Sequence, residues 1–505
     1  MFQTMANRDF EGIILSKMEH EATRMQREAV EEIVRFLSYD KDDALFLLTG
    51  FAGTGKTTLM AALVQTMREI GVETVLLAPT GRAAKVIASY SDKNAYTIHK
   101  EIYRQKSYNG PDTEFAPDFN RHKSALFIVD EASMISGQAQ AGAIFGTGDL
   151  LEDLVQYVYS GHGCRMLIVG DSAQLPPVGC ELSPALSADY LEGYGMRLFK
   201  ARLTEVVRQD SGGILWNATE LRQRLFEGEG DTFDTHCHIC PQIRFTGFAD
   251  IENVSGGQLI ERLQESYSKC GLDDTIVVTR SNKRAGIYNN GIRARILEHE
   301  ERLSGGDRVV IVKNNYYWVE PPKLVKRVDE ETGEVIEEEE TTGSSMSFIA
   351  NGEGAVVRRF RNVREVYGFT FADVTLQFPD YEYQEIEATA ILDTLQSDAP
   401  ALTREQQERL FQSVWEDYPE IRIRRDRMQA VREDPLFNAL QIKYGYAVTC
   451  HKAQGGQWRH VYIDIGYMNE EMMTREYIRW LYTALTRATE KVYMVNWPAS
   501  QTEKE

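Results

Sequence analysis

Four side chains in the amino-terminal part of the sequence could act together on a phosphoanhydride: Lys56, Thr57, Asp130 and Glu131. The first two belong to the run 50–58, which fits the pattern G-x-x-x-x-G-K-[ST]. There a glycine turn directs backbone N–H groups at phosphates, the lysine reaches the β- and γ-phosphates, and the hydroxyl binds Mg²⁺. Asp130 and Glu131 follow an apolar run, where one carboxylate can support the metal and the other can activate water. Acidic pairs at strand ends are also common helix caps. The spacing predicts binding and hydrolysis of a nucleoside triphosphate.

These residues need a parallel sheet to position them. Apolar runs at 44–49, 75–79, 125–129 and 166–169 read as buried strands, and a helix begins near residue 59. Each run is followed by glycine or polar residues, and open α/β sheets bind ligands at the carboxyl ends of their strands. The sequence therefore predicts that the candidate residues meet along one edge of a sheet.

Length and composition indicate a folded protein of several domains. The chain has 505 residues, of which 43% are hydrophobic and 10% aromatic, so we expect two to four domains and a soluble chain. No apolar run reaches membrane-spanning length, and the first residues lack the basic-then-apolar order of a signal peptide. We expect a cytoplasmic protein with no membrane contact.

The net charge of −20 argues against a wholly basic surface but leaves room for a local basic groove. Acidic residues concentrate at 329–331 and 337–340, which read as one exposed insertion. The stretch 400–437 has helical periodicity and carries Arg422, Arg424, Arg425 and Arg427. These arginines could follow a phosphate backbone, or they could form a solvated helix face.

Six cysteines in a chain of this length do not form a disulfide framework. Only the run His236-Cys237-His238-Ile239-Cys240 is clustered enough to suggest zinc. So short a span brings few ligands to one ion with good geometry, and no second C-x-x-C pair closes the site. An ordinary surface loop is the favoured interpretation.

The rest of the chain repeats the α/β pattern after an interruption. Residues 212–271 read as loop-rich, and a second α/β unit begins with the strand 275–279. Short strands near 307–312, 354–357 and 374–378 suggest a small barrel, and the last 65 residues return to α/β. An Asn-Gly pair within 100–122 favours a hairpin there.

Several single residues are open to two interpretations. Gln26 could read an adenine edge with its amide, or it could be a solvated helix glutamine. Gln174 could sense a γ-phosphate, and Arg208 could contact phosphate or form a surface ion pair. An arginine on a second α/β domain can act as an arginine finger, but Arg487 alone does not establish this role.

Taken in order, the segments resemble superfamily 1 helicases. The motifs Ala-Pro-Thr-Gly-Arg-Ala-Ala and His-Lys-Ala-Gln-Gly are most similar to those of the RecD-like and phage Dda-like branch, superfamily 1B. Members of this branch move 5′ to 3′ on single-stranded DNA. The matching segments are Gln26, 50–58, Pro79-Thr80-Gly81-Arg82, Thr97-Ile98-His99, Asp130-Glu131-Ala132-Ser133, Gly170-Asp171-Ser172-Ala173-Gln174, Arg208, 448–455 and Thr483-Ala484-Leu485-Thr486-Arg487.

The resemblance implies an α/β fold with two RecA-like P-loop domains, an inserted β-hairpin pin and an inserted small SH3-like β-barrel. It places the first domain at 1–99 and 123–212, the pin at 100–122, the second domain at 213–304 and 441–505, and the barrel with a helical extension at 305–440. Two features depart from the family pattern. Many relatives have Glu where this chain has Gln457, and the acidic insertion and the helical stretch look like additions.

The resemblance also implies roles for individual residues. The expected catalytic residues are Lys56, Asp130, Glu131, Gln174, Arg208 and Arg487. The expected nucleotide contacts are Gln26, Gly53, Thr54, Gly55, Lys56, Thr57, Thr58 and Gln457, with Thr57 and Asp130 on the metal. The expected DNA contacts are Pro79, Thr80, Thr97, His99, Tyr108, Phe115, Thr449 and His451.

The function that follows is ATP-dependent 5′ to 3′ translocation on single-stranded DNA with duplex unwinding, in replication, recombination or repair. ATP and Mg²⁺ are the expected cofactors, and single-stranded and forked DNA the expected partners, together with replication or recombination proteins. We expect a monomer. An RNA-directed helicase of the same superfamily is one alternative, and an ATP-dependent scaffold or clamp on DNA is another.

Overall fold

The computed structural model describes residues 7–18, 20–105, 115–138, 146–206, 212–226, 240–319, 324–328, 335–339, 346 and 348–503. Contacts group the chain into two compact units, and the first is discontinuous in sequence. The first unit contains Met1–Arg280 and Thr449–Glu505, and the second contains Ser281–Val448. The domain boundaries expected from the sequence stay a prediction.

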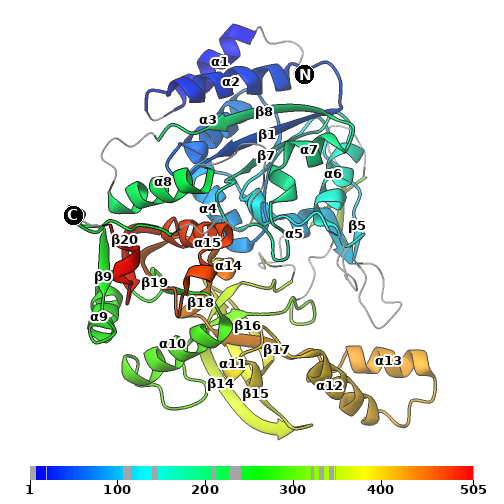
Figure 1. Ribbon diagram of the computed structural model, residues 1–505. Coiled ribbons are helices and arrows are strands. Elements are labelled where there is room, and N and C mark those ends of the chain that lie inside the picture. The colour runs from blue at the N-terminus through cyan, green and yellow to red at the C-terminus, as the bar shows by residue number, and fades with distance from the viewer. Residues whose placement is uncertain are drawn as a thin grey trace. The chain divides into compact units, whose positions relative to one another are not determined.

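The first sheet contains six parallel strands in the order β3-β2-β6-β7-β1-β8. β1, β7 and β8 of this sheet are labelled in Figure 1. Alternate residues of these strands face opposite sides, so Phe46 and Leu48 of β1 enter one core with the helices α1 to α4. The strands are β1 (Ala44–Gly50), β2 (Thr74–Ala78), β3 (Ala95–Thr97), β6 (Leu126–Val129), β7 (Arg165–Gly170) and β8 (Arg197–Leu203).

Two helices of this part precede β1, and the others follow strands along the chain. They are α1 (Asn7–Ser16), α2 (Arg24–Leu37), α3 (Lys56–Glu69), α4 (Gly81–Ser91), α5 (Ile98–Ile102), α6 (Leu150–Ser160) and α7 (Ala188–Glu192). The expected hairpin is present as the antiparallel pair β4 (Tyr103–Gln105) and β5 (Phe115–Pro117), and its turn lies outside the described residues.

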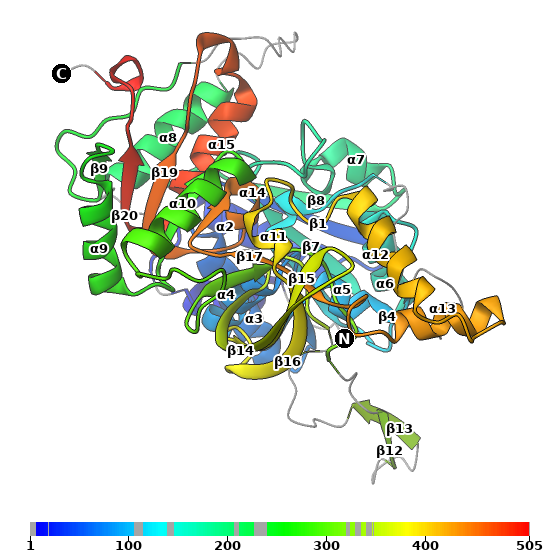
Figure 2. The ribbon, with the colours of Figure 1, turned by 90° about the horizontal axis from the view of Figure 1, so that it is seen from below.

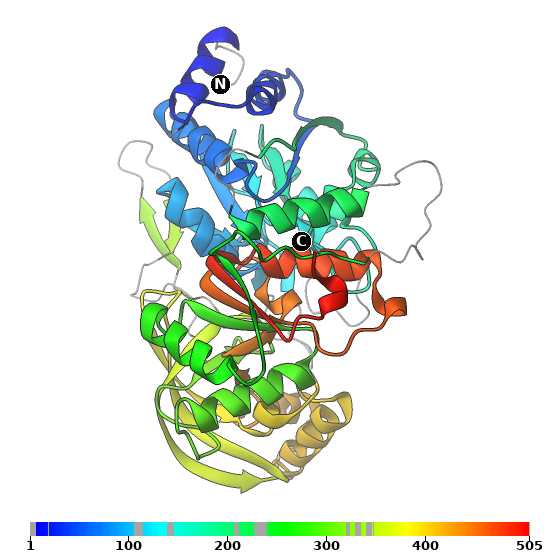
Figure 3. The ribbon, with the colours of Figure 1, turned by 60° about the vertical axis from the view of Figure 1, so that its left-hand side comes forward.

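The second sheet has the order β18-β10-β19-β20-β9, with β18 at the point where the chain passes between the two units. α9 packs on β10 and β19, and α15 packs on β19, β20 and α8. In Figure 3 the red-orange helix α15 lies beside the green helix α8. The elements are α8 (Gly213–Phe226), β9 (Ile251–Val254), α9 (Leu259–Cys270), β10 (Thr275–Thr279), β18 (Ala447–Thr449), α14 (Cys450–Ala453), β19 (Trp458–Asp464), α15 (Arg475–Leu485) and β20 (Ala488–Val495). The interpretation of 212–271 as loop-rich was wrong, because α8, β9 and α9 lie within it.

The second unit contains a closed barrel of five strands, β11-β14-β15-β16-β17. Only the β16–β17 pair is parallel among the described barrel strands. The strands are β11 (Arg308–Ile311), β14 (Gly354–Val366), β15 (Phe369–Phe378), β16 (Gln384–Ile391) and β17 (Leu440–Tyr444). Together with the two parallel sheets, this barrel confirms the predicted fold class.

Helices and one further hairpin complete the second unit. α12 and α13 pack on the barrel through a core that includes Phe371 of β15, Leu410 of α12 and Val431 of α13. The elements are α10 (Asn282–Arg295), α11 (Asp393–Gln396), α12 (Arg404–Glu416), α13 (Arg424–Arg432) and the pair β12 (Leu324–Val328) and β13 (Val335–Glu339). Across the part of the chain that is described, no helix is long and apolar enough to cross a membrane.

Candidate active site

The phosphate loop joins the end of β1 to the start of α3. Gly53 and Gly55 have φ values of +76° and +79°, a left-handed conformation that side chains other than glycine rarely adopt. A Cβ on Gly53 would also lie 2.9 Å from a methyl carbon of Leu215. The ammonium of Lys56 donates to the carbonyl oxygens of Gly50 at 2.8 Å and Phe51 at 2.9 Å. The lysine nitrogen is therefore held directly over the loop whose N–H groups can bind phosphates.

Gln26 is buried, with 2% of its surface exposed, so the alternative of a solvated helix glutamine is wrong. Its amide oxygen accepts a hydrogen bond from the backbone N–H of Thr23 at 2.9 Å, as part of a capping box. Its amide nitrogen donates to the carbonyl oxygen of Thr54 at 3.1 Å. Gln26 therefore ties the start of α2 to the phosphate loop, and one amide N–H and one oxygen lone pair remain for a ligand.

The two carboxylates follow β6. Asp130 accepts hydrogen bonds from the Tyr90 hydroxyl at 2.9 Å and from the backbone N–H of Glu131 at 2.7 Å. Glu131 has a φ of +50°, which is uncommon for a residue with a side chain and costs on the order of 1 kcal/mol. Burial raises the pKa of both carboxyl groups, and Arg487 opposes this effect at Glu131. A raised pKa suits Glu131 to accept a proton near neutral pH.

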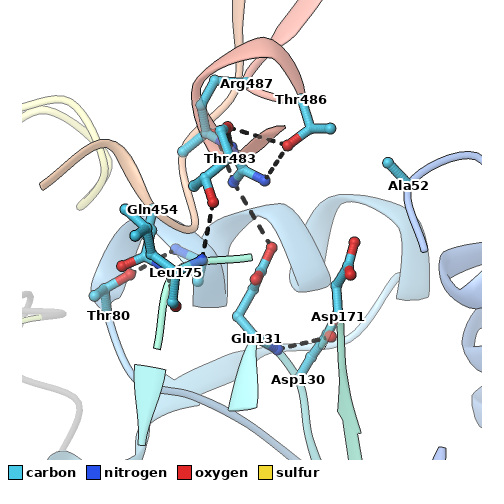
Figure 4. A network of polar contacts seen from close by, with 12 residues as sticks. Ala52, Thr80, Asp130, Glu131, Asp171, Leu175, Gln454, Thr483, Thr486 and Arg487 are labelled. Carbon is cyan, nitrogen blue, oxygen red and sulfur yellow. Dashed lines mark hydrogen bonds and ion pairs between the residues drawn. The ribbon is translucent and has the colours of Figure 1, made fainter. Parts of the chain in front are cut away.

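Arg487 comes from the end of α15 and reaches Glu131 with 4% of its side chain exposed. One guanidinium nitrogen lies 3.8 Å from a carboxylate oxygen of Glu131 (Figure 4). The guanidinium also donates to the carbonyl oxygens of Thr483 at 3.1 Å and Gly456 at 3.3 Å, and to the Thr486 hydroxyl at 3.2 Å. The helix packed on the second sheet thus supplies a fixed cation beside a carboxylate of the first sheet.

The loop after β7 connects these two halves. Leu175 donates its N–H to the Thr483 hydroxyl at 2.9 Å and accepts from the Gln454 amide at 2.8 Å (Figure 4). Gln174 is buried, and its side-chain oxygen makes no hydrogen bond with any described residue. An unmade hydrogen bond of this kind costs about 1–3 kcal/mol, so a donor that arrived with the substrate would be stabilised there.

Tyr482 of α15 is a site residue that the sequence reasoning missed. Its hydroxyl accepts the backbone N–H of Ala52 in the phosphate loop at 2.8 Å and donates to the carboxylate of Asp171 at 2.6 Å. The side chain is fully buried. In the sequence it looks like one more apolar residue of a core helix, and only its place in the same short segment as Arg487 signals a role.

The predicted nucleic-acid contacts also lie where strands end. Thr80 caps α4 by accepting the N–H of Ala83 at 3.2 Å, and Thr97 caps α5 by accepting the N–H of Lys100 at 3.2 Å. Thr449 is the last residue of β18 and precedes α14, and Pro79 lies half-buried after β2. A Cβ on Gly455 would lie 3.1 Å from the Thr80 hydroxyl, so the segment before β19 packs directly against the segment after β2.

Both histidines of this set are held neutral. Burial lowers the pKa of His99 to about 4 and lowers the pKa of His451 as well. His99 also packs against the ring of Tyr103, with ring centroids 5.7 Å apart. At neutral pH these side chains can offer hydrogen bonds to a nucleic acid but no positive charge.

Some predicted residues have no side-chain geometry here. Tyr108, Arg208 and the run 236–239 lie outside the described residues, and only the backbone of Phe115 is described. Cys240 is exposed beside Gln242 and Ser500. Gln457 is exposed, and Thr57 and Thr58 lie at the start of α3 beside Lys56. The roles assigned to all these residues stay predictions.

Comparison with known proteins matches both ends of the chain. A family described as an AAA domain matches residues 21–229, and a UvrD-like helicase C-terminal domain matches residues 444–495. The chain is 36% identical over 139 residues to the ATP-dependent RecD2 DNA helicase of Deinococcus radiodurans, covering 27% of this chain and 17% of that protein.

Two further similarities extend over more of the chain. It is 25% identical over 437 residues to the ATP-dependent DNA helicase Pif1 of Psychrobacter sp., covering 81% of this chain and 60% of that protein. A solved structure of two coordinating Pif1 helicases at forked duplex DNA is similar with a TM-score of 0.45 and 14% identity, covering 96% of this chain and 94% of that one. The chain thus spans less than two thirds of the length of both curated relatives.

Proposed function

Because the chain belongs to the RecD, Pif1 and Dda group of superfamily 1B helicases, we propose that it hydrolyses ATP to move 5′ to 3′ along single-stranded DNA and unwind duplex. The observation that carries this proposal is the 3.8 Å approach of Arg487 to Glu131. Arg487 and Glu131 lie on segments that pack on two different sheets. A change at the phosphates of the bound nucleotide would therefore affect contacts of both sheets. Replication, recombination or repair is the setting we propose.

In this mechanism each charged group has a separate task. Lys56 and Arg487 neutralise charge that develops on the transferred phosphoryl group, and Arg208 adds a third cation. Glu131 accepts a proton from the attacking water, because its raised pKa matches that step. The geometry around Glu131, a left-handed backbone and a fixed arginine, aims the carboxylate before substrate arrives.

The donor set around Asp130 fits Mg²⁺. The Thr57 hydroxyl and the Asp130 carboxylate are oxygen ligands of the kind that Mg²⁺ prefers, and Tyr90 fixes the Asp130 carboxylate. Bound there, the ion would supply positive charge that offsets the negative charge of the phosphates. Asp130 and Thr57 would hold it, and the remaining coordination would come from water and ATP.

Coupling to DNA would pass through the loop after β7. The Leu175 peptide is bonded on one side to Thr483, near Arg487, and on the other to Gln454, which precedes Gly455 and its contact with Thr80. Movement of the γ-phosphate contacts would thereby shift the segments proposed to touch DNA. These contacts are expected at phosphate and sugar, so binding would be sequence-independent and salt-sensitive.

The hairpin β4–β5 would meet the fork. Tyr108 and Phe115 are the proposed separating residues. We expect the double variant Tyr108→Ala/Phe115→Ala to retain DNA-stimulated ATPase and lose unwinding. Unwinding at the wild-type rate in this variant would remove the hairpin from the mechanism.

One experiment tests the proposal as a whole. Steady-state ATPase is measured with no nucleic acid, with single-stranded DNA and with RNA, beside unwinding of duplexes that carry a 5′ or a 3′ tail. Stimulation by DNA with unwinding only from the 5′ tail is the expected result, and Glu131→Gln is the inactive control. Stimulation by RNA alone would favour the RNA-directed alternative. ATPase indifferent to nucleic acid, without unwinding, would favour the scaffold.

A further inference from the structure

A cluster of metal-ligating side chains lies on the second sheet, away from the phosphate loop. Cys270 ends α9, His460 lies in β19 and Glu490 lies in β20. Figure 2 labels these three elements. Their ligand atoms, a thiol sulfur, an imidazole nitrogen and a carboxylate oxygen, all lie within 4.8 Å of one another. The three residues are far apart in sequence, and the packing of α9 on β19 brings them together.

Hydrogen bonds fix which nitrogen of His460 carries a proton. Tyr462 donates its single hydroxyl proton to the carbonyl oxygen of Arg262 at 2.5 Å. The 2.7 Å contact between the Tyr462 and Ser266 hydroxyls therefore uses the proton of Ser266. Ser266 then has only a lone pair for Nδ1 of His460 at 2.8 Å, so Nδ1 must donate. In the neutral ring, Nε2 is left with a lone pair.

That lone pair faces the other two ligands. His460 is 2% exposed, and its Nε2 makes no hydrogen bond with any residue that the structure describes. The nearest Glu490 oxygen lies 3.6 Å away, too far for a hydrogen bond. Burial lowers the pKa of His460, which disfavours the imidazolium. A bare nitrogen lone pair facing a carboxylate is an unfavourable arrangement unless a cation lies between them.

We propose that Cys270, His460 and Glu490 form a zinc site that ties α9 to the strands β19 and β20. Thiolate, imidazole and carboxylate are the ligand set of Zn²⁺, and water would complete a four-coordinate ion. Binding forms an S–Zn bond as the Cys270 thiol releases its proton to solvent. Ser266 is a positioning residue, because it orients the His460 ring through Nδ1.

Two basic residues compete with the metal. The Lys269 ammonium donates to one oxygen of Glu490, and Arg459 donates to the other at 2.8 and 3.0 Å. These bonds hold the pKa of Glu490 at about 2, so the carboxylate is ionised at all relevant pH values. Lys269 contacts the Glu490 oxygen that lies nearest His460, so Lys269→Ala is expected to tighten zinc binding. If these residues formed only an ordinary ion pair, Lys269→Ala would not change the affinity for zinc.

The test uses full-length protein freed of metal with a chelator. Co²⁺ is titrated in, and the near-ultraviolet thiolate-to-cobalt absorption band is followed, then displaced with Zn²⁺. One equivalent is expected to bind, and zinc is expected to raise the unfolding temperature. Cys270→Ser should abolish the band, His460→Gln should weaken binding by at least about tenfold, and Ser266→Ala by about 10- to 100-fold.

Controls separate this site from the other cysteines. Cys180→Ser is the matched variant, since Cys180 is also half-buried, and it should bind as the wild type does. Cys237→Ser/Cys240→Ser should keep the band. Absence of a band in the wild type, or a band that survives Cys270→Ser and is lost in the Cys237/Cys240 variant, would overturn the proposal. No arm measures ATPase, so the result is independent of the proposed function.

Discussion

Glu131 and Arg487 show how a single contact can set both charge and geometry. Burial raises the pKa of the Glu131 carboxyl, while the nearby guanidinium lowers it. Removing the cation should therefore leave a carboxyl that protonates at higher pH. It should also remove a positive charge from the phosphoryl group in the transition state.

If Arg487 acts as an arginine finger, Arg487→Met should lower kcat of the DNA-stimulated ATPase by at least about 10³-fold. The acid limb of the remaining activity should move to higher pH, because protonated Glu131 cannot accept the proton of water. Arg487→Lys, which keeps the charge, should shift the limb less. The pH dependence of kcat is measured for the wild type and for both variants. An acid limb of Arg487→Met at the same pH as in the wild type would argue against Glu131 as the base.

Tyr482 makes a separate prediction. Tyr482→Phe removes the hydroxyl that joins Ala52 of the phosphate loop to Asp171, and a lost buried bond of this kind costs about 1–1.5 kcal/mol. We expect the stimulation of ATPase by DNA to fall about tenfold while basal hydrolysis changes less. Tyr493→Phe is the control, since this buried tyrosine makes no hydroxyl hydrogen bond with the described residues. Equal loss of basal and stimulated rates in Tyr482→Phe would contradict a coupling role.

At the scale of elements, local pattern decided what could be predicted. The phosphate loop was predictable because Gly53 and Gly55 adopt a backbone conformation that favours glycine. The apolar runs predicted the strands β1, β2, β6 and β7. α9 was missed because it is largely polar, and Leu263 and Ser266 are the residues that it buries. The spacing of Thr23 and Gln26 is that of a capping box, which a sequence pattern can indicate. The hydrogen bond from Gln26 to Thr54 joins residues 28 positions apart, so it could be found only from the folded structure.

The first turn of α13 carries charge that helix formation does not favour. Arg422, Arg424 and Arg425 are exposed and form no ion pair with the described residues, and cations are disfavoured near a helix N-terminus. If they bind DNA phosphates, replacing all three with Ala should lower affinity and reduce the slope of log K against log salt by about 2. Arg404→Ala, which removes an exposed arginine paired with Glu408 on α12, is the control. An unchanged slope would favour the alternative that these arginines form a solvated helix face.

The second unit, which contains the barrel, has a buried ion pair between Arg293 and Asp307. Asp307 is fully buried and accepts two bonds from Arg293 at 2.9 Å, with further bonds from His299 and Tyr446. Burial alone would raise the pKa of Asp307, but these donors lower it. The stabilisation is therefore complete above the usual aspartate pKa and is lost as pH falls through the lowered value.

Asp307→Asn should destabilise this unit by about 3–5 kcal/mol, because it leaves the Arg293 guanidinium buried without its anion. Asp373→Asn breaks a partly exposed pair with Arg364 in the same barrel and should cost less than about 1 kcal/mol. Urea unfolding of the two variants at neutral pH compares them. Equal destabilisation would mean that burial does not distinguish the two pairs.

For the whole molecule, order along the chain and order in space differ. The second unit is one continuous segment, Ser281–Val448, whereas the first is completed only by Thr449–Glu505. In the second sheet, β10 pairs with β19 and β9 pairs with β20, and β9 and β10 are not neighbours. β9 has no sheet partner before β20 is made, and β10 has none before β18 and β19 are made.

During synthesis this arrangement imposes a waiting time. A ribosome adds roughly 5–20 residues per second, so the stretch from Val254 of β9 to Ala488 of β20 takes roughly 10–50 s to make. β9 lacks its partner through that interval, and the apolar strand β10 lacks its partners until β18 and β19 are made, while the second unit, encoded in between, can already fold. Arg487 is translated 431 residues after Lys56 (487 − 56). A nascent chain would therefore carry a finished phosphate loop through that interval without the arginine proposed to act on it, and is expected to stay catalytically silent until Arg487 has been added.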